Sequence, residues 1–299
     1  MISNWIQSFR IRTLPLSLAT IGMGSILALQ SDSFEVIVFV FTLVTAVLLQ
    51  ILSNLSNDFG DYTHGADNED RQGPERTVQS GKITPSAMRI AIGISALLSM
   101  VSGIYLLYIA DLDLNSFFFI LAAGVASILA AMTYTLGKKP YGYRGLGDIF
   151  VFLFFGWVGV LGTYYLQVKT FDWLMLLPSS TCGLFITAVL NINNMRDIDS
   201  DTIAGKRTIP VIIGIKAARI YHAILLTFGW VFYIIYAVIR FNAIEHWIFL
   251  FALPFFLLNL YGVFKRNRNR MDPLLKQMVI ATLLFITLIM AGQLISMAI

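Results

Sequence analysis

Thiol, imidazole and charged groups are scarce in this sequence. It contains one cysteine, Cys182, and three histidines, His64, His222 and His246. So few and so scattered ligands exclude a disulfide framework and a zinc site built from cysteine and histidine. Charged residues form only 13% of the chain, about half the share of a soluble domain, whereas hydrophobic residues form 57% and the mean hydropathy is +0.76. A water-soluble fold is therefore excluded.

Long apolar runs separate the few charged groups. A helix that crosses the hydrocarbon core of a membrane needs about 20 predominantly apolar residues. Nine runs approach this length, at about 14–30, 35–57, 86–109, 114–135, 148–167, 173–194, 215–239, 246–264 and 275–298. The sequence therefore predicts an all-α integral membrane protein. Its nine transmembrane helices form a single bundle, and residues 1–299 form one domain.

Lysine and arginine are distributed unevenly between the two sides of this bundle. With a cytoplasmic N-terminus, the inside segments hold all of the 21 basic residues except Lys169 and Arg240. The positive-inside rule therefore predicts that the C-terminus lies outside and that the protein lies in the cytoplasmic (inner) membrane, in contact with lipid. Because this asymmetry accounts for the net charge of +4, that charge does not indicate binding to nucleic acid.

Two acidic clusters lie where apolar runs reach the predicted cytoplasmic side. Each combines an asparagine with two aspartates about one helical turn apart, Asn54, Asp58 and Asp61 in the first cluster and Asn193, Asp197 and Asp201 in the second. On a helix, each set shares one face, where like charges repel. Magnesium would reverse the sign of this interaction, because it accepts carboxylate and amide oxygens and completes its shell with water and phosphate oxygens.

The paired clusters predict a magnesium site whose six ligands are these asparagines and aspartates, with the four aspartates as catalytic residues. A charge at membrane depth costs at least about 3 kcal/mol, so such groups indicate function. A solvated helix end would explain one cluster equally well. The matched spacing of both clusters on one membrane side favours two faces that hold a diphosphate between them through magnesium.

Further motifs accompany the clusters. They are Arg10-x-Arg12-Thr13-Leu14-Pro15, Asn57-Asp58-x-x-Asp61, Asp70-Arg71-x-Gly73-Pro74, Pro140-Tyr-Gly-Tyr143-Arg-Gly145-Leu-Gly147-Asp148, and Asp197-x-x-x-Asp201 with Gly205-Lys206-Arg207-Thr208-Ile209-Pro210-Val211. These blocks resemble the UbiA superfamily of intramembrane prenyltransferases, and within it the menaquinone-pathway branch. One departure is visible, because the superfamily pattern places an acid four residues after Asp61, where this chain has Gly65 and then Asp67.

Cations between the clusters, together with Tyr134-x-x-x-Lys138, which is similar to a superfamily motif, complete the predicted site. The expected substrate-binding residues are Asn57, Arg71, Arg76, Tyr134, Lys138, Arg144 and Lys206. The predicted cytoplasmic location of the basic residues would bring them near the site whether or not they bind substrate.

The resemblance implies magnesium-dependent transfer of a polyprenyl group from polyprenyl diphosphate to 1,4-dihydroxy-2-naphthoate. Loss of the carboxylate would give demethylmenaquinone, with diphosphate as the second product. Another acceptor, such as 4-hydroxybenzoate, a porphyrin or a glycerol phosphate, stays open as an alternative. A divalent-cation transporter is a further alternative, which the almost wholly apolar middle of the spans disfavours.

Overall fold

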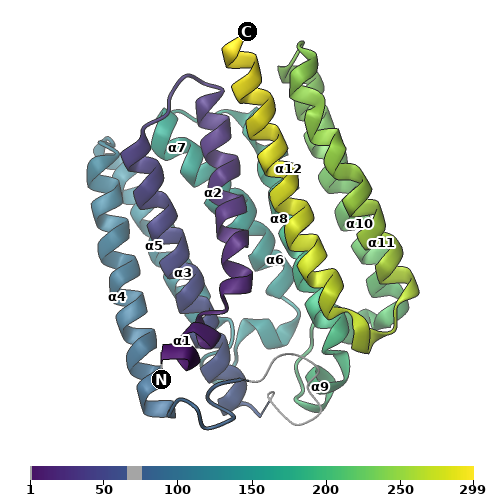
Figure 1. Cartoon of the computed structure of the whole chain (residues 1–299). Coiled ribbons are helices and arrows are strands. Elements are labelled where there is room, and N and C mark those ends of the chain that lie inside the picture. The colour runs from purple at the N-terminus through teal and green to yellow at the C-terminus, as the bar shows by residue number, and fades with distance from the viewer. Residues whose placement is uncertain (1, 66–75) are drawn as a thin grey trace.

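A computed structural model describes residues 2–65 and 76–299 of the chain, and within these residues all regular structure is helical (Figure 1). Eight helical segments are long and apolar enough to cross a membrane. A ninth span arises if α1 (Ile2–Phe9) and α2 (Leu14–Leu29), which are bent by 50° at η1 (Ile11–Thr13), are counted together. The all-α transmembrane bundle predicted from the sequence is confirmed.

The other spans follow the predicted order, and several are composite. They are α3 (Val36–Thr63), α4 (Pro85–Ile109), α5 (Leu114–Thr133), the run of α6 (Gly147–Val151), η3 (Phe152–Leu161) and α7 (Gly162–Val168), the run of η4 (Trp173–Met175) and α8 (Leu176–Arg196), α10 (Ile209–Arg240), the run of η5 (Ile244–Ala252) and α11 (Leu253–Lys265), and α12 (Asp272–Ala298). Three short helices, η2 (Tyr141–Arg144), α9 (Ile198–Ile203) and η6 (Arg268–Arg270), lie in connections.

Two spans extend further toward the acidic end than predicted. Helix α3 continues to Thr63, so that Asn54, Asp58 and Asp61 all lie on one helix. Helix α10 begins at Ile209 but is interrupted at Gly214, whose φ of 79° lies in the left-handed region that favours glycine. Helix α3 therefore carries a polar end beyond its predicted apolar run, whereas the segment that α10 adds, residues 209–214, is itself apolar.

An aromatic core joins α8, α10, η5 and α12. Phe185, Trp230, Tyr233, Phe249 and Phe285 are all buried, and their rings meet mainly edge to face or at a tilt with centroids 4.8–6.2 Å apart. Such arrangements align the positive edge of one ring with the negative face of another. These rings pack the middle of α8 against α10, η5 and α12.

Helix η3 is a π-helix that packs against α8 through glycine. A Cβ atom at Gly156 would lie 2.8 Å from the carbonyl oxygen of Ser179 and 3.0 Å from the Cα of Gly183. Backbones approach this closely in membranes only where side chains are absent. Phe154 and Phe155 of η3 line the central cavity.

The two ends of the bundle differ. Helices α1 and α9 both lie at the end of the bundle opposite the C-terminus (Figure 1). Asn54 of α3 donates a hydrogen bond to the carbonyl oxygen of Phe9 at the end of α1, so the first acidic cluster lies at this end too. Asp201 belongs to α9, which brings the second cluster to the same end.

Candidate active site

A cavity of about 940 Å³ extends along the inside of the bundle. Its polar end is lined by Arg10, Asn57, Asp61, Arg76 and Lys206, among others. Its walls are mainly aliphatic and aromatic side chains of α2, α3, α5, η3 and α8, and it reaches Asn115 at the opposite end of α5. The shape suits a ligand with one highly charged end and a long apolar tail.

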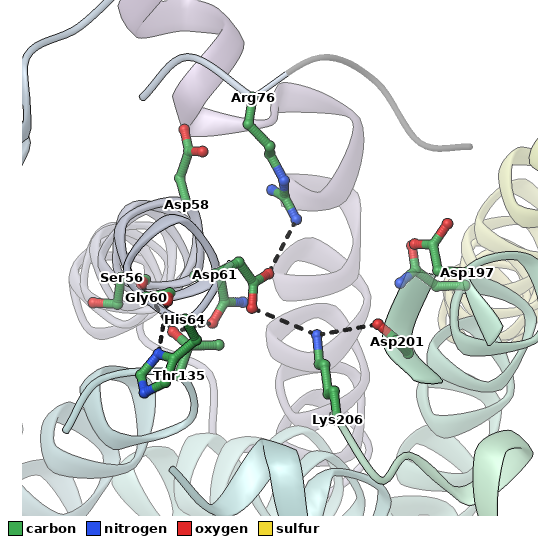
Figure 2. A network of polar contacts seen from close by, with 12 residues as sticks. Ser56, Asp58, Gly60, Asp61, His64, Arg76, Thr135, Asp197, Asp201 and Lys206 are labelled. Carbon is green, nitrogen blue, oxygen red and sulfur yellow. Dashed lines mark hydrogen bonds and ion pairs between the residues drawn. The ribbon is translucent and has the colours of Figure 1, made fainter. Parts of the chain in front are cut away.

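Lys206 joins the two acidic clusters across this cavity. Its Nζ lies 3.6 Å from Oδ1 of Asp61 on α3 and 3.8 Å from Oδ1 of Asp201 on α9 (Figure 2). The three side chains are nearly buried, with 11% of Lys206 exposed. Burial opposes the charge on Lys206, but the two carboxylates outweigh it and hold the pKa of the ammonium above its usual value. The lysine therefore carries its charge at neutral pH.

Asp61 has two further polar neighbours. Arg76 Nη2 lies 3.5 Å from its Oδ2, and the Tyr143 hydroxyl donates a hydrogen bond of 2.9 Å to its Oδ1. Lys206 also lies over the ring of Tyr143, 5.3 Å from the centroid. Two cations and a hydroxyl thus surround one carboxylate. The same donors have the chemistry to bind phosphate oxygens.

Asp58 faces a different set of groups, although it shares α3 with Asp61 (Figure 2). Thr77 Oγ1 donates to its Oδ2 at 2.8 Å, and Ser8, on α1, approaches the same oxygen at 3.5 Å. Its Oδ1 is buried and has no hydrogen-bond partner among the described residues. An orphaned carboxylate oxygen is costly in such a place unless a cation or donor completes it.

The second cluster departs from the predicted single helical face. Helix α8 ends at Arg196, the chain turns at Asp197 with φ −95° and ψ 13°, and α9 begins at Ile198. Asn193, Asp197 and Asp201 therefore do not continue one helix, and that prediction is wrong.

An arginine network accounts for this break. The Arg196 guanidinium donates to both carboxylate oxygens of Asp197, at 2.8 and 2.7 Å. It also donates to Asn193 Oδ1 at 2.9 Å and to Asp272 at the start of α12 at 2.7 Å. Asp197 is consequently turned toward α12 rather than toward Lys206, as Figure 2 shows. The sequence reasoning missed this network because nothing local linked Asp272 to the cluster.

The donor set fits magnesium, although it does not enclose a metal by itself. Within the described part of the chain, no three side chains of the His, Cys, Asp and Glu types converge on one point. Magnesium requires only one or two protein carboxylates when water and phosphate oxygens supply the rest. Asp61 and Asp201 on the two sides of Lys206, and the orphaned oxygen of Asp58, are hard donors of this kind.

Two further predicted residues lie at the cavity. Asn57 accepts a hydrogen bond of 3.2 Å from Thr135, and Tyr134 lines the wall beside Tyr141 and Phe150. Burial raises the pKa of Tyr134 to about 12, so its hydroxyl stays neutral at neutral pH. Tyr134 and its neighbours thus offer uncharged aromatic surface next to the polar end.

Two predicted substrate residues are not brought to the cavity. Lys138 and Arg144 are exposed, and Lys138 lines a separate groove with His64 and Arg89. The chain turns at Gly137, where φ is 95°, and this turn directs Lys138 away from the acids. Arg71, like Asp67, lies outside the described residues. Sequence reasoning missed Tyr143 and Thr77 as polar neighbours of the aspartates, although Tyr143 stands inside a quoted motif.

The family model of the "UbiA prenyltransferase family" matches residues 17–292. The chain belongs to the UbiA prenyltransferase family. UbiA-family relatives named "1,4-dihydroxy-2-naphthoate octaprenyltransferase" include a protein of Escherichia coli that is 43% identical over 96% of this chain and 94% of the relative. One of Haemophilus influenzae is 41% identical over 98% of this chain and 96% of the relative.

Solved UbiA structures share the fold at low sequence identity. A UbiA homolog from Aeropyrum pernix superposes with a TM-score of 0.73 at 17% identity, covering 96% of this chain and 99% of that chain. A UbiA homolog from Archaeoglobus fulgidus, described as bound to GPP and Mg2+, gives a TM-score of 0.71 at 13% identity and covers 97% and 99%. The likeness establishes the UbiA fold over nearly the whole chain.

Proposed function

We propose that this UbiA-family protein transfers a polyprenyl group from polyprenyl diphosphate to 1,4-dihydroxy-2-naphthoate, with loss of the acceptor's carboxylate. The observation that carries the proposal is Lys206 between Asp61 and Asp201 at the polar end of a long apolar cavity. The names of the two bacterial relatives above support the choice of acceptor.

The polar end of the cavity binds the diphosphate in this proposal. Arg76, Tyr143 and Lys206 turn from Asp61 to the phosphate oxygens, which accept charge-assisted hydrogen bonds from them. The apolar tail lies along the cavity, where it leaves water for hydrocarbon-like surroundings. The rings of Tyr134 and Tyr141 lie beside the first carbon of the tail and stabilise the positive charge that develops there.

The aspartates hold magnesium in this proposal. Asp61 and Asp201 supply oxygens from the two sides of the bundle, and Asp58 supplies its orphaned Oδ1. Magnesium held by these residues would neutralise the diphosphate and so make it a better leaving group. Asn54, Asn193 and Asp197 were predicted as further ligands. Each already has protein partners, so they serve chiefly to position the ends of α3 and α8.

The chemical step balances without an added oxidant or reductant. The ring carbon that carries the carboxylate bonds to the first carbon of the prenyl chain as the bond from that carbon to the diphosphate oxygen breaks. The electron pair of the broken bond leaves with diphosphate. The bond from the ring to the carboxylate then breaks, carbon dioxide leaves, and its electron pair restores the aromatic ring. Exclusion of water prevents capture of the allylic cation before the acceptor attacks.

Complementation tests the proposed function in cells. A bacterial strain without its own 1,4-dihydroxy-2-naphthoate prenyltransferase should regain menaquinone, measured in lipid extracts, when it expresses this chain. The Asp61→Asn variant, expressed to the same level in the membrane, should fail to restore it. Absence of menaquinone with the wild-type chain, together with restored ubiquinone in a strain that lacks 4-hydroxybenzoate prenylation, would instead assign the other acceptor.

The proposed site faces the cytoplasm in this scheme, as the distribution of basic residues indicates. A reporter fused after Ile299 should therefore report the outside, and one inserted between α11 and α12, at 265–272, should report the inside. Protease protection of both fusions in sealed vesicles measures this. Two reporters on the same side would contradict the topology.

A further inference from the structure

A groove of about 620 Å³ lies where α3 ends, α4 begins and α5 ends. These three helices pack against one another. Among the described residues, the groove and the central cavity share no lining side chain. The groove is lined by Phe59, Thr63, His64, Arg89, Ile92, Gly93, Met132, Leu136, Gly137 and Lys138. It is therefore a separate site, and it includes the lysine that does not reach the aspartates.

The lining of this groove changes from polar to apolar with depth. On α4, Arg89 lies one helical turn nearer the polar end than Gly93, a separation of about 6 Å along the helix axis. On α3, His64 at the end of the helix lies beyond Phe59, and Lys138 lies beyond the end of α5. The cations therefore lie at the outer rim of the groove, and apolar side chains lie deeper. A phospholipid has the same order, with its phosphate at the membrane surface and its chains inside.

The formal charges at the rim are all positive. No aspartate or glutamate of the described residues lines the groove. The guanidinium of Arg89 lies 6.0 Å from the ring centroid of Phe59, and it donates a long hydrogen bond of 3.5 Å to Ser86. Within the described part of the chain, neither Arg89 nor Lys138 forms an ion pair with a carboxylate. Both cations can therefore pair with an anion that enters the groove.

Gly93 leaves the floor of the groove open. Among the described residues, no heavy atom would lie within 4 Å of a Cβ atom at this position. Close helix packing, which accounts for Gly156, therefore does not account for Gly93. The missing side chain instead leaves room for a hydrocarbon chain beside Ile92 and Met132, which line the same groove.

Topology explains only part of this arrangement. The positive-inside rule alone would bring arginine and lysine to this end of the bundle. It would not place two cations from different helices around one groove, without an acid among its described lining residues and above an apolar floor. Basic pockets between transmembrane helices bind the head groups of anionic lipids. Guanidinium and ammonium groups both donate charge-assisted hydrogen bonds to phosphate oxygens.

We propose that this groove binds an anionic phospholipid of the surrounding membrane. The lipid phosphate pairs with Arg89 on α4 and with Lys138 after α5, and one acyl chain lies over Gly93. A lipid with net negative charge, such as phosphatidylglycerol, is preferred over phosphatidylethanolamine, whose ammonium group would face two cations. The bound lipid links α4 to α5 beside the end of α3 and so stabilises the helix end that carries Asp58 and Asp61. This role does not depend on which acceptor the protein prenylates.

Native mass spectrometry of the purified full chain tests the groove, with phosphatidylglycerol and phosphatidylethanolamine as probes. Each lipid is titrated, and the Kd of the first bound lipid is read from the intensities of the lipid adducts. The wild type should bind phosphatidylglycerol more tightly than phosphatidylethanolamine. Arg89→Gln should weaken the binding of phosphatidylglycerol roughly fivefold, the usual loss for one basic residue near an anionic lipid. The preference for phosphatidylglycerol should shrink accordingly.

Gly93→Leu tests the acyl-chain part of the groove with both cations in place. The leucine side chain should occupy the floor, and leucine favours a helix more than glycine does, so the fold should persist. This variant should also bind phosphatidylglycerol more weakly than the wild type. Lys216→Gln is the matched control, because Lys216 is an exposed cation near the start of α10 and does not line the groove. Its affinity for phosphatidylglycerol should equal that of the wild type.

Thermal unfolding supplies a second measurement. A ligand that binds the native state raises the Tm. Phosphatidylglycerol should therefore raise the Tm of the wild type and of Lys216→Gln by the same amount, and should raise that of Arg89→Gln and of Gly93→Leu by less. If Arg89→Gln does not fold, the comparison of Gly93→Leu with the wild type decides.

Three outcomes would overturn the lipid site. An equal loss of affinity in Arg89→Gln and Lys216→Gln would indicate a diffuse effect of surface charge. Unchanged affinity for phosphatidylglycerol in both Arg89→Gln and Gly93→Leu would show that the lipid binds elsewhere. Wild-type dimers that Gly93→Leu abolishes, without a preference between the two lipids, would assign the groove to a second copy of the chain.

Discussion

Replacement of Lys206 by glutamine should lower kcat/KM for polyprenyl diphosphate by about 10²–10³-fold, the usual cost of removing one preorganised donor to a charge that develops in the transition state. Lys206 is nearly buried between Asp61 and Asp201, so a neutral side chain removes the positive charge that lies between these two carboxylates. The effect should appear mainly in kcat, because negative charge increases as diphosphate departs.

Lys138→Gln is the matched control for this prediction. Lys138 is exposed and lines a groove apart from the cavity, so its loss should change kcat/KM by less than about threefold. Initial rates at varied octaprenyl diphosphate, with membrane-inserted protein quantified for each variant, measure both. An equal loss of kcat/KM in the two variants would contradict the assignment of Lys206. A loss confined to Lys138→Gln would instead indicate that Lys138 contacts the diphosphate.

Asp58→Asn should lower turnover by at least about 10²-fold, because binding of magnesium at a leaving group supplies several kcal/mol. Asparagine keeps the size of the side chain and an oxygen that accepts from Thr77, so the fold around Ser8 and Thr77 should persist. The buried Oδ1 of Asp58, which has no hydrogen-bond partner in the described part of the chain, is the group proposed to bind the metal. The variant should also require more magnesium for half-maximal activity than the wild type, and a chelator should abolish turnover in both.

Asp199→Asn tests whether this loss is specific. Asp199 is 69% exposed and pairs with Arg268 at 2.6 Å on the surface, where an ion pair contributes about 0–1 kcal/mol. Its activity and magnesium requirement should match those of the wild type. Wild-type magnesium dependence in Asp58→Asn would remove Asp58 from the metal site.

The transmembrane bundle could be predicted from the sequence because the signal is local. Each span is an apolar run of sufficient length. Inside hydrocarbon such a run has little alternative to a helix, because the helix satisfies all of its own backbone hydrogen bonds. The predicted ends were less accurate, since α3 continues through polar residues to Thr63 and α10 begins at Ile209, six residues before the predicted run. Beyond its apolar run, α3 is stabilised by tertiary contacts at the acidic end, which a hydropathy profile does not detect.

The site was predicted in part, and the errors have a common cause. The spacing of Asp58 and Asp61 correctly indicated one helix, because α3 continues through both. The similar spacing of the second cluster failed at Asp197, because Arg196 binds both Asp197 and Asp272, which is distant in sequence. The sequence likewise could not show which of Lys206 and Lys138 contacts the aspartates, since both are cations in connections at the acidic end. The turns at Gly137 and Gly205, which precede the two lysines, direct their side chains differently.

One reaction tests the central claim most directly. Purified wild-type protein in liposomes is incubated with magnesium, octaprenyl diphosphate and 1,4-dihydroxy-2-naphthoate labelled with carbon-13 in the carboxylate. Product mass and released carbon dioxide are then read by mass spectrometry. The account predicts octaprenylated dihydroxynaphthalene and labelled carbon dioxide in equal amounts, and neither with chelator present. Prenylated 4-hydroxybenzoate from a parallel reaction, with no product from the naphthoate, would contradict it.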